Sequence, residues 1–119
     1  MSEAARRHRE TVVQRAVHGP GLATSAARRA AFANLGVDAP ARALVDKVTQ
    51  RAWTVTDADV AATKAAGVSE DEIFELTVCA ALGQATRQLA AALAALDAAS
   101  PTSAAGAAPA PRTDDGGRR

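Results

Sequence analysis

Aromatic residues and cysteine are scarce in this sequence. Its 119 residues include no Tyr, one Trp, two Phe and one Cys, although 48% of them are hydrophobic. A single Cys cannot form a disulfide within the chain. Alanine and medium-sized aliphatic residues must therefore provide nearly all of the packing. Because alanine combines the highest helix propensity with very small bulk, such a core suits helices that approach each other closely.

Long apolar runs and a large net charge are also missing. No stretch approaches the roughly 20 apolar residues that span a bilayer, and the N-terminus is polar and Arg-rich, without the apolar segment of a signal peptide. We therefore expect a cytoplasmic protein with no membrane partner. The net charge of +1 and the shortage of aromatic residues argue against nucleic acid as a partner.

The charges are nevertheless separated along the chain. Residues 1–36 contain six Arg and two Glu, a net charge of +4, whereas residues 37–97 contain five Lys or Arg and nine acids, a net charge of −4. This separation fits docking between molecules, attraction within one molecule, or no role at all. We interpret the clustered Arg residues as a solvated basic face and keep nucleic-acid binding through the N-terminal helix as a weaker alternative.

Apolar spacing, capping residues and chain breaks predict an all-α protein, a compact bundle of about five helices with a long C-terminal helix. The clearest break is Gly19-Pro20-Gly21, because Pro cannot continue a helix. We expect one helical domain over residues 1–98 and a disordered tail over residues 99–119, where small residues and Pro replace the apolar pattern. The predicted helices cover residues 3–17, 25–34, 40–52, 57–66 and 69–97.

The second of these helices has distinct core-facing and solvent-facing sides. Thr24 or Ser25 can cap its N-terminus, and Gly36 can end it as a C-cap. Arg28 and Arg29 are expected to face solvent. The residues expected to face the core are Ala27, Ala30, Ala31 and Leu35.

The last helix is the most secure element of the sequence. Ser69 and Glu72 have the spacing of a capping box, in which each side chain bonds to the other residue's backbone N–H. Gly83 interrupts the helix at a cost of about 1 kcal/mol relative to Ala, which predicts close approach of another helix. The apolar stripe of this helix consists of Ile73, Val78, Leu82, Ala85, Leu89, Leu93 and Leu96.

Two segments carry a family resemblance. Residues 52–60 read AWTVTDADV and residues 65–73 read AAGVSEDEI, with Arg87 further along the chain. Over about residues 42–96 this pattern resembles the C-terminal part of the alkylhydroperoxidase D-like and carboxymuconolactone decarboxylase-like family. The resemblance implies an all-α fold that assembles as an oligomer. Because the long apolar stripe of the last helix would also leave apolar surface to hide, we expect a homo-oligomer or a subunit that docks on a partner protein.

The resemblance does not include the residues that carry out the chemistry of that family. Its members use a C-x-x-C pair followed by a His, in which one thiolate attacks and the second thiol resolves. Here Cys79 is alone, Leu82 stands where a second Cys would fall, and both His8 and His18 precede it. We therefore expect a non-catalytic accessory or interaction protein. The alternative is a peroxidase-type thiol oxidoreductase that uses Cys79.

Four residues are the candidates for a site. Cys79 is either a reactive thiol or, as we prefer, a buried structural residue. His18 is either a general base or a cation at a helix end. Trp53 either lines a pocket or, in our preferred interpretation, anchors a loop against the core. Arg87 belongs to a possible pocket or interface.

An acidic cluster completes the sequence features. The four residues share the start of the last helix, where negative charge favours the positive helix end. We prefer this explanation to a metal site, and the sequence predicts no cofactor. The cluster consists of Glu70, Asp71, Glu72 and Glu75.

Overall fold

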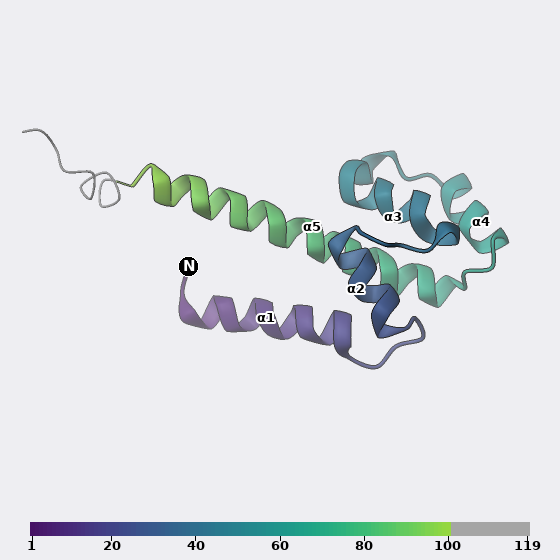
Figure 1. Ribbon diagram of the computed structural model, residues 1–119, viewed down its shortest axis with the longest axis horizontal. Coiled ribbons are helices and arrows are strands. Elements are labelled where there is room, and N and C mark those ends of the chain that lie inside the picture. Colours follow the sequence, from purple (N-terminus) through teal and green to yellow (C-terminus); the bar gives the residue numbers. More distant parts are fainter. Residues whose placement is uncertain (101–119) are drawn as a thin grey trace, which may run out of the picture. The chain divides into compact units, whose positions relative to one another are not determined.

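The computed structural model describes residues 1–100, and within them the protein is entirely helical, with five α-helices, one short 3-10 helix and no strand (Figure 1). This confirms the predicted all-α bundle. Most of the predicted tail, residues 101–119, lies outside the described residues. The elements are α1 (Glu3–His18), α2 (Ser25–Ala33), α3 (Ala39–Arg51), η1 (Ala52–Thr54), α4 (Asp57–Ala65) and α5 (Glu70–Ala98).

Side-chain caps explain where the helices begin. Thr24 accepts a 3.0 Å hydrogen bond from the backbone N–H of Ala27 and so caps α2. The capping box expected before the last helix is present, because Glu72 donates its N–H to the Ser69 hydroxyl at 3.1 Å and accepts the Ser69 N–H at 2.9 Å. Each bond satisfies a backbone group that the first helical turn leaves without a partner.

The end of α2 differs from the prediction. Asn34, with φ of 53° in the left-handed region, is the C-cap, two residues before Gly36. Its N–H bonds to the Ala31 carbonyl at 3.2 Å. Asn tolerates this conformation better than most residues do. The early turn leaves Leu35 78% exposed, so the expected inward position of Leu35 is wrong.

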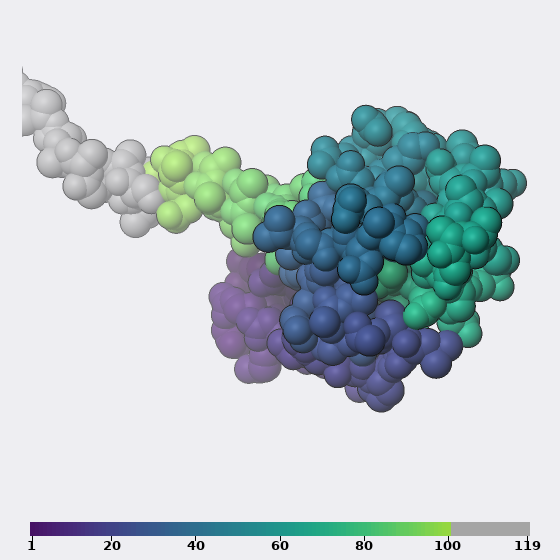
Figure 2. All heavy atoms as spheres, turned by 45° about the vertical axis from the view of Figure 1, so that its right-hand side comes forward, coloured from purple at the N-terminus to yellow at the C-terminus, as the bar shows by residue number. Residues whose placement is uncertain are grey.

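A core of small and medium-sized residues lies within the compact unit Met1–Arg87. Val45 and Cys79 are its largest fully buried side chains. In Figure 2, α2 and α3 form one continuous surface with α4 and the start of α5 beside them. The buried cluster consists of Val17, Ala23, Ala31, Val37, Ala41, Val45, Leu76, Cys79 and Ala80.

The last part of α5, from Gln88 onward, belongs to a second unit. The domain limit expected at residue 98 therefore stays a prediction. Across residues 1–100, the helices fall short of the length and apolar character that crossing a bilayer requires.

Candidate functional site

Arg28 is buried rather than solvated. Only 5% of it is exposed, which overturns the expectation that it faces solvent. Its Nε donates to the Ala23 carbonyl at 3.2 Å, and one terminal nitrogen donates to the Ala16 carbonyl at 3.1 Å. Both acceptors flank the turn between α1 and α2. A buried carbonyl without a donor is costly, and Arg28 supplies donors to two of them.

Glu75 holds the same turn from α5. Its carboxylate accepts the backbone N–H of Leu22 at 2.9 Å and of Ala23 at 2.8 Å. These two bonds, helped by the nearby charge of Arg28, lower the pKa of Glu75 below its ordinary value. The carboxylate also lies so close to Gly21 that a Cβ there would be 2.8 Å from Oε1. Glu75 is thus a structural clamp on the turn.

Cys79 lies beside this clamp and is 1% exposed, so the predicted burial of the thiol is confirmed. Its Sγ donates to the Ala16 carbonyl over 3.4 Å. Burial raises the pKa of Cys79, Arg28 opposes that change and Glu75 adds to it. Because the thiolate is the reactive form of cysteine, this environment suppresses the chemistry that a peroxidase needs.

The other Arg residues of the N-terminal half present less free charge than expected. Arg6 and Arg7 both pair with Glu3. Arg9 is half-buried, and its Nε is buried with no hydrogen-bond partner in the structure. With Arg28 also turned inward, the basic face of residues 1–36 is smaller than the sequence indicates.

His18 and Trp53 do not join Cys79. His18 is the last residue of α1, as the helix-end interpretation requires, and its Nδ1 lies 3.4 Å from the Ser25 hydroxyl. Trp53 is 82% exposed on η1, so the predicted anchoring of this side chain against the core is wrong. Its loop is instead fixed by polar bonds, since Lys47 donates to the Thr54 carbonyl and to Asp59.

Arg87 is fixed where α2 meets α5. A Cβ at Gly83 would be 2.7 Å from the carbonyl carbon of Phe32, which confirms the predicted close approach of another helix. One turn later, Arg87 donates from one terminal nitrogen to the Phe32 carbonyl at 2.8 Å and from the other to Gln84 Oε1 at 3.2 Å. The guanidinium therefore satisfies a carbonyl at the end of α2.

A polar cavity opens beside this guanidinium, with a volume of about 370 Å³. All of its lining residues belong to the unit Met1–Arg87. Thr49 is the most deeply buried of them, 7% exposed, and its hydroxyl has no hydrogen-bond partner in the described part of the chain. The Arg87 cavity is lined by Ala33, Asn34, Thr49, Gln50, Gln84 and Arg87.

The first half of α5 has apolar side chains on two opposite sides. The side packed on the core consists of Ile73, Leu76, Cys79, Ala80 and Gly83. The opposite side, which we call the outer face, consists of Phe74, Val78, Ala81, Leu82 and Ala85. Phe74 is 69% exposed, both Ala residues are exposed, and Val78 and Leu82 are half-buried. Of the apolar stripe predicted along this helix, Val78, Leu82 and Ala85 lie on the outer face, whereas Ile73 lies on the core side.

Comparison of the chain with family models, with curated proteins and with solved structures found no match.

Proposed function

We propose that this protein is a non-catalytic accessory protein of the alkylhydroperoxidase D-like type, and that it self-associates through the outer face of α5. The exposure of that face is the observation on which the proposal rests. A helix that is apolar on all sides is normally buried on all sides. Between Leu76 and Leu82 the helix contains no charged residue, yet only its core side is fully buried, and the outer face stays partly exposed.

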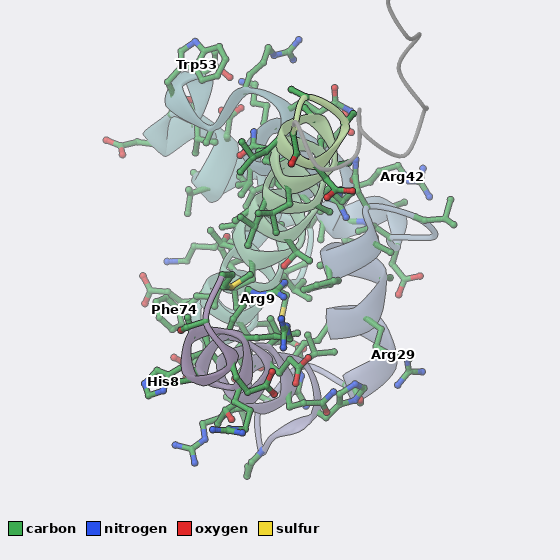
Figure 3. The ribbon with its side chains drawn as sticks, turned by 90° about the vertical axis from the view of Figure 1, so that its left-hand side faces the viewer. His8, Arg9, Arg29, Arg42, Trp53 and Phe74 are labelled. Atoms are coloured by element: carbon green, nitrogen blue, oxygen red, sulfur yellow. The ribbon has the colours of Figure 1, made fainter. Side chains whose placement is uncertain are left out.

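Two further rings lie on the left of the view in Figure 3, opposite to two Arg residues. Phe74 and His8 lie at the lower left and Trp53 lies apart from them at the upper left, whereas Arg29 and Arg42 lie on the right. Exposed aromatic side chains are the usual anchors of protein interfaces, and large apolar patches on a monomer mark contact surfaces. The side that carries the outer face is therefore the better candidate for docking.

The competing thiol mechanism meets an obstacle at Cys79. Peroxide reduction by a single thiol begins with attack by a thiolate, whereas burial both hides Cys79 and raises its pKa. We expect Cys79→Ala to leave the cellular role of the protein intact. Consumption of peroxide in proportion to one thiol per chain would favour the oxidoreductase instead.

A charge placed on the outer face tests the self-association. Ala85→Glu adds a carboxylate at an exposed position and keeps a good helix former. We expect light scattering after size exclusion to show an oligomer for the native chain and a monomer for Ala85→Glu. Ala61→Glu is the matched control, because Ala61 is exposed on α4 and away from the outer face.

Two results would contradict the proposal. One is a native chain that remains monomeric at every concentration measured. The other is an oligomer that persists in Ala85→Glu to the same extent as in Ala61→Glu. Circular dichroism of each variant shows whether the helices are intact, so that loss of association is not confused with unfolding.

A further inference from the structure

The hydroxyl of Thr49 is buried and has no hydrogen-bond partner within residues 1–100. Thr63 and Thr86, which also lie in helices, donate to the carbonyl four residues earlier, at 2.9 Å to Asp59 and at 2.7 Å to Leu82. Thr49 makes no such bond and lines the Arg87 cavity instead. Polar groups buried without a partner are rare in native proteins, so this hydroxyl points to a missing oxygen or donor inside the cavity.

The remaining side chains of the cavity have spare N–H groups. A guanidinium has five N–H donors, and only two bonds engage Arg87. The amide oxygen of Gln84 accepts one of those bonds, which leaves both of its N–H groups available. Asn34 and Gln50 each use one amide N–H on Oδ1 of Asp46, at 3.3 and 3.5 Å, and keep the other. A fitting occupant must therefore present acceptor oxygens.

The charges around the cavity favour an occupant without net charge. Arg87 brings one positive charge, and Asp46, bonded to Asn34 and Gln50, brings one negative charge. The cavity also lies beside the C-terminal ends of α2 and α3, where helix dipoles are negative. An anion would gain from Arg87 but be repelled by Asp46 and by both helix ends.

We propose that the Arg87 cavity binds a small uncharged molecule that presents carbonyl oxygens, such as an amide. Arg87 and Gln84 donate to a carbonyl oxygen from α5, and the Thr49 hydroxyl contacts the occupant from α3. Asn34 closes the cavity from the end of α2. The cavity includes no residue of the outer face, so this site is independent of the proposed self-association.

The cavity has a suitable size and a rigid frame. Its volume of about 370 Å³ lies in the range of small-molecule sites. Arg87 is held by Phe32, whose backbone is in turn packed against Gly83. Thr49 is fixed by burial in α3. Side chains that are already in place bind a ligand with little loss of freedom.

The test uses the full chain and two matched probes. N-acetylglycinamide is uncharged, whereas N-acetylglycine at neutral pH is an anion of nearly the same shape. We expect saturable shifts of the backbone amide signals of Asn34, Thr49 and Arg87 in a nuclear magnetic resonance titration with the uncharged probe. The expected Kd is in the millimolar range, since so small a ligand makes few contacts. The anion should bind at least about fivefold more weakly.

Two Thr variants separate a binding role from a structural one. Thr49→Val removes the unpaired hydroxyl and should weaken binding of N-acetylglycinamide by about fivefold or more, while the fold is retained because valine has the same shape. Thr63→Val removes a hydroxyl that is equally buried, 5% exposed on α4, and should leave the Kd unchanged. Arg87→Gln is a second variant that should abolish the saturable shifts.

Three outcomes would overturn the proposal. They are an absence of saturable binding by the native chain, equal or tighter binding of the anionic probe, and a Kd for Thr49→Val that matches that of Thr63→Val. Retained binding by Arg87→Gln would also contradict the role given to the guanidinium.

Discussion

At the scale of single residues, Ala23 shows how polar side chains complete a core of small residues. Its backbone is buried at a turn where no helix can supply partners. Arg28 donates to its carbonyl, and Glu75 accepts from its N–H. Both groups are thus satisfied by side chains from different helices, as buried backbone groups must be. The turn between α1 and α2 is ordered by this pair of side chains.

The clamp formed by Glu75 makes stability depend on pH. Hydrogen bonds from Leu22 and Ala23 lower the pKa of Glu75 in the folded chain, so its contribution is complete above the carboxyl group's ordinary pKa and is lost as pH falls through the lower folded value. We expect Glu75→Gln to lower the free energy of unfolding by about 1 kcal/mol at pH 7.

The difference between Glu75→Gln and the native chain should shrink between about pH 5 and about pH 3. Urea unfolding curves at a series of pH values measure it. Asp71→Asn is the control, because this exposed carboxylate makes no side-chain hydrogen bond or ion pair within residues 1–100. A difference that stays constant down to pH 3 would refute the ionised clamp.

Residue-level burial was only partly predictable from the sequence. Cys79 was expected to be buried, because free cysteine behaves as a small apolar residue. Arg28 was expected to be exposed, since the polar residues of an amphipathic helix normally face solvent. What draws it inside is a pair of carbonyls, one at the end of α1 and one in the turn that follows it. A sequence pattern does not show which backbone groups a turn leaves without partners.

At the scale of elements, α5 shows why the core side of a helix can be misjudged. The outer face has the larger residues at regular spacing, so it dominates the apolar pattern. The core side includes Cys79, Ala80 and Gly83, which contribute little hydrophobicity but allow α2 to approach closely. Small residues at a close contact are selected for their lack of bulk. Caps, by contrast, are local, and the Ser69–Glu72 box was predictable from spacing alone.

The close contact at Gly83 gives a prediction for the element. Gly83→Ala raises helix propensity by about 1 kcal/mol, but its Cβ would overlap the carbonyl group of Phe32. Because that group is backbone and cannot turn aside, we expect a net loss of about 2 kcal/mol in the free energy of unfolding. Thermal and urea unfolding measure the change.

Ala81→Gly is the reciprocal control for this contact. Ala81 is exposed on the outer face, so at protein concentrations where the chain is monomeric its replacement should cost only the propensity term of about 1 kcal/mol. Opposite substitutions at two positions of one helix should therefore both destabilise the protein. A gain in stability for Gly83→Ala would show that α2 does not pack against this position.

At the scale of the whole molecule, self-association should couple stability to concentration. A partner that binds the folded chain alone raises the apparent stability by mass action. For a dimer, each tenfold increase in protein concentration adds about 1.4 kcal/mol to the apparent free energy of unfolding. We expect the unfolding midpoint of the native chain to rise accordingly, and that of Ala85→Glu to stay constant. Equal behaviour of the two chains would count against the outer face.

One carbonyl, that of Ala16, joins three helices and has a practical consequence. It lies in α1 and accepts from Arg28 of α2 and from Cys79 of α5. Since the sulfur is covered where α1 is attached, a reagent can reach it only when this attachment opens. The rate at which a thiol reagent labels Cys79 in the native protein should therefore report how often the α1 contact opens. This rate gives a free energy of local opening, as amide hydrogen exchange does.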